Sequence, residues 1–148
     1  MNLLKKISEM EALNYGVHTK FDQMDNGESK FRLNCFMDRS SYCRTVAPDA
    51  GTWQNSHFHR AATELYIVQT GWIVYAEIRA DQLLVQILRE GDSVVFLPEV
   101  HHNIYLSAGS VIHTVKYGQS LFEQDWYASP ELDELTRRIN PEVLFKLL

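Results

Sequence analysis

The stretch from Gly51 to Gly71 reads GTWQNSHFHRAATELYIVQTG and contains two histidines, His57 and His59, followed five residues later by Glu64. On a β-strand, side chains two residues apart point to the same face. Both imidazoles can therefore reach one metal ion, and a turn after His59 would bring the Glu64 carboxylate to the same place. This stretch predicts a metal site.

The size and charge of the chain limit the classes of protein to which it can belong. A length of 148 residues predicts one domain, residues 1–148, long enough to bury a hydrophobic core without disulfides. The net charge of −5 argues against a nucleic-acid partner, because Lys and Arg are not in excess. No apolar run reaches the roughly 18–20 residues of a membrane span, and no apolar segment follows the charged N-terminus as in a secretory signal. We expect a soluble cytoplasmic protein with no membrane partner.

The hydrophobic pattern favours a mostly β fold. Short runs rich in apolar and β-branched residues alternate with turn residues at close, even spacing, which is typical of an antiparallel sandwich or barrel. The predicted strands cover residues 31–37, 42–47, 64–68, 72–78, 83–88, 93–97, 102–106 and 111–117.

Both ends of the chain have helical features. Apolar residues at helical spacing over 2–13 predict a short amphipathic helix or a packed N-terminal arm. Near the other end, Ser129 as N-cap and Pro130 at the first helical position predict a helix over 129–138. A further helical turn is expected over 140–148, so that the segment 129–148 packs on the barrel exterior.

The two cysteines, Cys35 and Cys43, lie at equal distances from Arg39, where a turn is plausible. A hairpin centred on Arg39 would place them opposite each other. In a cytoplasmic protein we expect two reduced thiols.

A second stretch supplies a further candidate ligand. The segment from Gly91 to Asn103 contains Pro98, which ends a predicted strand, and then His101 and His102. In an extended segment these two histidines point to opposite faces, so only one of them is expected to bind the metal.

The two stretches together resemble the cupin family. The first cupin motif matches at each of its fixed positions, which are Gly51, His57, His59, Glu64 and Gly71. The second motif matches at Gly91, Pro98 and His102. Glu99 departs from the motif, because the family usually has glycine there, and His101 stands where proline is common.

The resemblance implies a small jelly-roll-type β-barrel over about residues 31–118. It also implies the metal ligands His57, His59, Glu64 and His102. Three imidazoles and one carboxylate suit Fe(II), Mn(II), Ni(II), Co(II) or Zn(II), and four protein ligands leave open positions for water or substrate on an ion that takes six.

Other polar residues are candidates for the site. Tyr66 shares a strand face with Glu64 and is a candidate acid or base. On the strand 111–117, His113 and Lys116 lie on opposite faces; His113 would act as a proton shuttle and Lys116 as an anion-binding group or base. Arg44 would bind substrate if its face of the strand 42–47 points inward.

These features predict a metal-dependent enzyme that isomerises or epimerises a small polar substrate, carbohydrate-like or carboxylate. Glu64, Tyr66 or His113 would move the proton. The alternatives are an iron-dependent dioxygenase and a non-catalytic ligand-binding or sensor protein. A homodimer is also expected, because strands such as 31–37 would leave sheet edges that pairing could cover.

Overall fold

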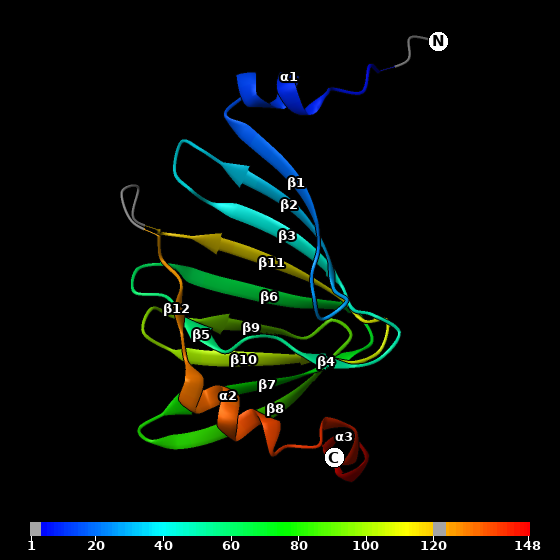
Figure 1. Cartoon of the computed structure of the whole chain (residues 1–148), viewed down its shortest axis with the longest axis vertical. Coiled ribbons are helices and arrows are strands. Elements are labelled where there is room, and N and C mark those ends of the chain that lie inside the picture. Colours follow the sequence, from blue (N-terminus) through cyan, green and yellow to red (C-terminus); the bar gives the residue numbers. More distant parts are fainter. Residues whose placement is uncertain (1–3, 120–123) are drawn as a thin grey trace.

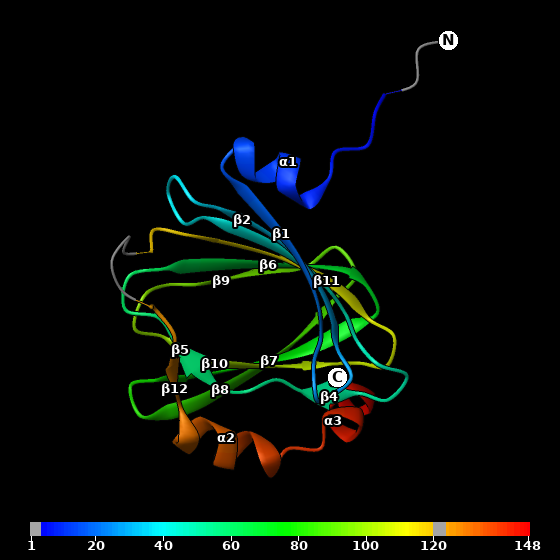
Figure 2. The same ribbon diagram turned by 45° about the horizontal axis from the view of Figure 1, so that its top comes forward.

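The structure is a computed structural model that describes residues 4–119 and 124–148. Two antiparallel sheets face each other and enclose the interior of a barrel (Figures 1 and 2). The predicted mostly β fold is confirmed.

The first sheet, called sheet A, has the strand order β1-β2-β3-β11-β6-β9. Its strands are β1 (Val17–Gln23), β2 (Ser29–Cys35), β3 (Ser41–Val46), β11 (Val111–Tyr117), β6 (Thr63–Thr70) and β9 (Ser93–Phe96). Strand β1 precedes the range predicted for the barrel and forms one edge of the sheet.

The second sheet, called sheet B, has the strand order β12-β5-β10-β7-β8, and β4 also pairs with β10. Its strands are β12 (Tyr127–Ala128), β5 (His57–Phe58), β10 (His101–Leu106), β7 (Trp72–Arg79), β8 (Gln82–Arg89) and β4 (Thr52–Trp53).

The two sheets bury a shared apolar core. Alternate residues of β6, β7, β9, β10 and β11 point inward, as the period of a strand requires. The fully buried members include Val68, Ile73, Phe96, Ile104 and Ile112. This core occupies one end of the barrel interior, and the polar cluster described below adjoins it, since the Phe96 ring stacks on the His102 ring at 3.9 Å.

The N-terminal helix α1 (Glu9–Asn14) is shorter than the predicted range 2–13. It begins where a capping box forms: the Ser8 side chain accepts from the Glu11 N–H, and the Glu11 carboxylate accepts from the Ser8 N–H. The helix ends before Gly16, whose φ of 73° suits glycine.

The C-terminal helices α2 (Pro130–Arg137) and α3 (Pro141–Leu147) lie against the outer side of sheet B, as expected (Figure 1). Leu132 of α2 is fully buried. Ser129 stands at the N-cap position but its side chain makes no capping bond, because its hydroxyl pairs with His101 Nδ1 at 2.8 Å.

The two cysteines do not lie opposite each other, as a hairpin centred on Arg39 would have placed them. Strands β2 and β3 pair with Asn34 opposite Ser41, so Cys43 faces Arg32 instead of Cys35. The register differs by three residues from that of a hairpin centred on Arg39, and both cysteines are free thiols.

Among the described residues, none of the helices has the length and apolar character needed to cross a bilayer.

Candidate metal centre

The four predicted ligands meet at one point inside the barrel. His57 lies in β5, His59 follows directly after it, Glu64 is in β6, and His102 in β10 pairs with His57 across sheet B. Their ligand atoms all lie within 4.8 Å of one another, and all four side chains are buried. Sheets A and B thus both contribute to the cluster.

The Glu64 carboxylate is at the centre of this cluster. Its Oε2 lies 3.1 Å from His102 Nε2 and 3.8 Å from His57 Nε2, and its Oε1 lies 3.2 Å from His59 Nε2. Burial alone would raise the pKa of Glu64, but the three imidazoles of His102, His57 and His59 beside the carboxylate outweigh it and hold that pKa well below the usual range. The carboxylate is therefore ionised at neutral pH.

The opposite ring nitrogen of each histidine faces a backbone carbonyl. Nδ1 of His57 lies 2.9 Å from the Asn55 oxygen, and Nδ1 of His102 lies 2.9 Å from the Val100 oxygen. Nδ1 of His59 contacts the carbonyl of Asp125. A carbonyl oxygen only accepts, so each Nδ1 carries the proton, and in the neutral ring Nε2 is left as a lone-pair donor.

The donor set fits a divalent transition metal. With Nδ1 protonated, three Nε2 lone pairs and an ionised carboxylate converge in a buried space. Burial lowers the pKa of His102, and the neighbouring Glu64 carboxylate opposes this shift. His59 Nε2 is buried without a hydrogen bond of acceptable geometry, although Glu64 Oε1 is 3.2 Å away. Such convergence of acceptors is costly unless a cation satisfies them.

The two adjacent histidines of the second motif have different environments. His102 points into the barrel, whereas His101 lies on the outer side of β10, where its ring stacks on Phe58 at 4.2 Å and bonds Ser129. The alternation of a strand accounts for this separation.

Tyr66 lies beside the cluster. Its hydroxyl donates to Glu64 Oε2 at 3.0 Å, and the side chain is buried. Burial, and then the neighbouring Glu64 carboxylate, raise the pKa of Tyr66 well above the usual value. Tyr66 is therefore a proton donor at neutral pH and not a base.

The remaining predicted site residues do not all reach the interior. The structure places His113 and Arg44 on the outer side of sheet A. There His113 Nε2 donates to Gln69 Oε1 at 2.5 Å, and the Arg44 guanidinium lies over the Phe31 ring. Lys116 lies on the opposite face of β11 and lines the same cavity as Glu64.

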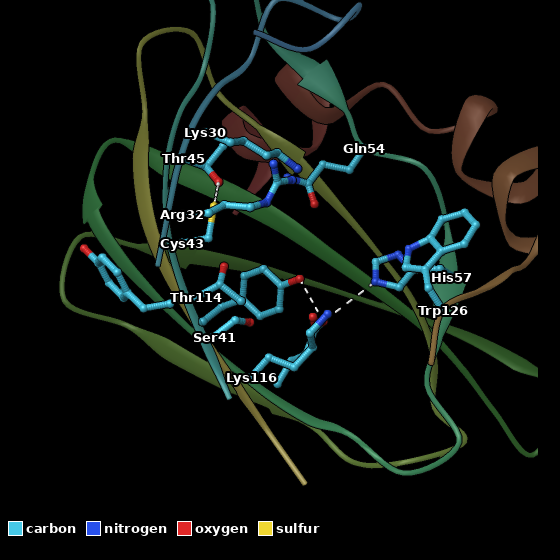
Figure 3. Close-up of a pocket in the computed structure, with 13 residues that line it drawn as sticks. Lys30, Arg32, Ser41, Cys43, Thr45, Gln54, His57, Thr114, Lys116 and Trp126 are labelled. Carbon is cyan, nitrogen blue, oxygen red and sulfur yellow. Dashed lines mark hydrogen bonds and ion pairs between the residues drawn. The ribbon is translucent and has the colours of Figure 1, made fainter. Parts of the chain in front are cut away.

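This cavity measures about 160 Å³ and adjoins a wider one of about 510 Å³. Lys30, Arg32 and Gln54 lie together on one side of it, and His57 with Trp126 lies across from them (Figure 3). Lys30 pairs with the buried Glu28 at 3.1 Å, and Arg32 pairs with Asp22.

Sequence reasoning missed Lys30, Arg32, Trp126 and Asp125. In β2, Lys30 and Arg32 alternate with Phe31 and Leu33, and the usual rule would turn the apolar pair inward. The alternation is visible in the sequence, but this rule would place Lys30 and Arg32 on the outer face, whereas they line the cavity.

Asp125 supports the ligand turn from outside the two motifs. Its Oδ1 accepts from the Arg60 N–H at 2.6 Å, and its Oδ2 accepts from Ala61 and Ala62 at 3.0 and 2.7 Å. Its own carbonyl contacts His59 Nδ1. One residue thus holds the turn between His59 and Glu64 and orients the His59 ring.

Comparison with protein-family models finds no match, and comparison with curated protein sequences finds none either. Solved structures do match. An RmlC-like cupin from Shewanella frigidimarina is 17% identical with a TM-score of 0.57, covering 68% of this chain and 85% of its own. KdgF from Halomonas sp. is 15% identical with a TM-score of 0.57, covering 68% and 87%.

Oxalate decarboxylase from Bacillus subtilis gives a TM-score of 0.60 at 12% identity. The match covers 88% of this chain but only 34% of that enzyme, so this chain spans about a third of its length. At these identities the likeness shows the fold alone. The clustering of the four ligand residues is shown by the distances between their donor atoms. The chain therefore has the cupin fold, with a buried cluster of His57, His59, Glu64 and His102 suited to a metal ion.

Proposed function

We propose that this chain is a metal-dependent enzyme that isomerises or epimerises a small, acidic, carbohydrate-like molecule. The observation that carries the proposal is the lining of the cavity: Lys30, Arg32 and Lys116 surround the same space as Glu64 and His57. Cationic side chains beside a metal cluster favour a substrate that carries a carboxylate.

The three cations differ in how they are neutralised. Lys30 and Arg32 each have a carboxylate partner, Glu28 and Asp22. Lys116 forms no ion pair or hydrogen bond with any described residue, although it sits on the cavity wall. We assign Lys30 and Arg32 to attracting the substrate carboxylate, and the Lys116 amine to proton exchange at the reacting carbon.

Isomerisation also needs a proton donor at oxygen. Tyr66 remains protonated and presents its hydroxyl beside Glu64, so we assign it to hydrogen bonding with the reacting oxygen. A bound divalent metal would supply Lewis-acid polarisation of a substrate carbonyl, which acidifies the neighbouring carbon. The Lys116 amine, in its neutral form, would accept the proton from carbon and return it, so there is no net oxidation or reduction.

Metal binding is tested first. Elemental analysis of the purified protein, reloaded separately with each candidate metal, should give about one ion per chain. His59→Ala and Glu64→Gln should reduce this content strongly. His101→Ala is the matched control and should leave it unchanged, because His101 faces α2 and not the cluster. Full metal content in the Glu64 and His59 variants would contradict the assigned ligands.

Turnover is tested with the loaded protein. Acidic sugars in deuterated water should incorporate deuterium at carbon, detected by NMR. Lys116→Arg should keep substrate binding but lose exchange, because a guanidinium does not give up its proton near neutral pH. Lys116→Met should weaken binding as well.

Two outcomes would replace this proposal with one of the alternatives. Oxygen uptake by the iron-loaded protein with substrate would indicate a dioxygenase. Binding of acidic ligands without exchange under any metal would indicate a non-catalytic ligand-binding protein.

A further inference from the structure

The outer side of sheet A carries two rows of side chains that cross the strands. In the first row, Leu33, Tyr42, Val115, Leu65 and Val95 are direct cross-strand neighbours over β2, β3, β11, β6 and β9. The second row runs through Phe21, Phe31, Arg44, His113 and Ile67 over β1, β2, β3, β11 and β6.

Eight large apolar side chains on this side are exposed to solvent. They form what we call the apolar face: Phe21, Phe31, Leu33, Tyr42, Ile67, Val95, Val115 and Tyr117.

The usual pattern of a half-exposed sheet is reversed in the part of sheet A next to the cavity. There Lys30, Arg32, Glu64 and Lys116 point into the barrel, whereas their apolar neighbours along the same strands, such as Phe31, Leu65 and Val115, point out. An antiparallel sheet with one face in water normally shows polar residues on that face. The outer side of sheet A therefore has the apolar composition of a surface that is normally buried.

The helices leave this side of sheet A open. Helices α2 and α3 lie against sheet B, and α1 lies beyond the edge strand β1 (Figures 1 and 2). Over residues 4–119 and 124–148, no helix covers the two rows.

The apolar face has the area of an interface. A large apolar side chain has about 200 Å² of surface, and exposure ranges from 37% at Tyr42 to 59% at Phe21. The eight side chains therefore offer roughly 700 Å², more than the largest patch of a typical monomer and near the roughly 800 Å² that each partner contributes to a standard interface.

The lack of carboxylates in the two rows favours a second copy of this acidic chain as the partner. The chain carries a net charge of −5, yet the two rows contain no carboxylate. Arg44 is their only fixed charge, and it is spread over the Phe31 ring. A second copy of an acidic chain can approach here without repulsion between carboxylates.

We propose that the apolar face binds a second copy of this chain, with the two outer sides of sheet A packed face to face around a two-fold axis. Aligned sheets pack about 10 Å apart with interdigitating side chains, and an isologous contact buries the same surface on both copies. The four ligand side chains lie inside each barrel and away from the proposed interface, so this proposal does not depend on the proposed function.

Light scattering after gel filtration at about 10 µM tests the proposal. The wild-type chain should have twice the 17.2 kDa mass of one chain. Val115→Lys and Phe31→Lys should each raise the dissociation constant at least 100-fold and give a monomer. Both side chains are exposed, so circular dichroism should show the fold unchanged.

Leu84→Lys is the matched control, because Leu84 is 39% exposed on β8 of sheet B, against 40% for Val115. It should leave the dimer intact. The proposal is overturned if the wild-type chain is a monomer at this concentration, or if Leu84→Lys and not Val115→Lys dissociates the dimer. A monomer that binds phosphatidylcholine vesicles through this face would overturn it as well.

Discussion

Replacing Asp125 by alanine should both destabilise the fold and disturb the arrangement of the metal ligands. The carboxylate accepts three backbone hydrogen bonds, from Arg60, Ala61 and Ala62, and is buried. In the alanine variant these three N–H groups lose their acceptor. The turn that carries His59 toward Glu64 then loses its support.

The loss in the free energy of unfolding can be worked out from the exposure of the three N–H donors. The Ala62 N–H is buried, and losing a charged acceptor there costs about 1.5–3 kcal/mol. Arg60 and Ala61 are exposed, so water can replace the acceptor and each loss costs about 0.5–1.5 kcal/mol. The free energy of unfolding should fall by about 2.5–6 kcal/mol, and a domain in the middle of the usual range of about 5–15 kcal/mol stays folded after this loss.

Urea unfolding followed by circular dichroism measures this change. Asp92→Ala is the matched control, because Asp92 accepts one exposed backbone bond, from Arg89 at 2.8 Å, and should cost about 1 kcal/mol or less. Metal affinity should fall by about 10–100-fold in Asp125→Ala, as for other groups that orient a ligand. A loss below about 1 kcal/mol with unchanged metal affinity would refute the reasoning.

The effect of Asp125 should depend on pH. Burial would raise the pKa of Asp125, but the N–H groups of Arg60, Ala62 and Ala61 outweigh it and lower that pKa. A depressed folded-state pKa contributes stability that is present above the unfolded pKa of about 3.9 and lost as pH falls through the folded value. The difference between wild type and Asp125→Ala should therefore shrink below about pH 4.

Three further substitutions or treatments test the fold. Glu99→Gly should raise the free energy of unfolding by about 0.5–1 kcal/mol, because Glu99 has a φ of 66° that glycine adopts freely; a loss of stability in urea unfolding would contradict this. Gly51→Ala should cost about 1–3 kcal/mol, since its new Cβ would lie 1.7 Å from the Tyr105 hydroxyl oxygen and 2.4 Å from its Cζ, and less in a Tyr105→Leu background, which removes both atoms; equal costs in both backgrounds would argue against that clash. Dithiothreitol should leave the melting temperature unchanged, because Cys35 and Cys43 are free; a drop in melting temperature would indicate a disulfide.

Much of the metal centre could be predicted from local spacing. The alternation of a strand separates His102 from His101, and the His-x-His spacing in the turn before Glu64 brings three donors together. The departure at Glu99 proved compatible with the turn, because Glu99 adopts the left-handed conformation and donates its N–H to the His59 carbonyl at 2.7 Å.

The remaining site residues depended on which face of each strand turned inward. Local alternation shows that two residues lie on opposite faces, but not which face is the inner one. His113 and Lys116 were equal candidates on β11, and Arg44 competed with its neighbours on β3. The pairing of β11 with β3 and β6 turned Lys116 toward Glu64 and His113 away from it. In β2 and the later part of β11 the apolar side faces outward, so hydrophobicity alone would have chosen the wrong side.

The sequence by itself determined the β class through short-range periodicity, and its resemblance to the two cupin motifs identified the four donors that converge on one point. Only the tertiary structure decided the cations around the cavity, the support from Asp125 and the apolar face of sheet A. Each of these depends on contacts between segments far apart in the chain, such as Asp125 with Ala62, and on which side of a sheet encloses the interior. Local sequence patterns do not encode either of these.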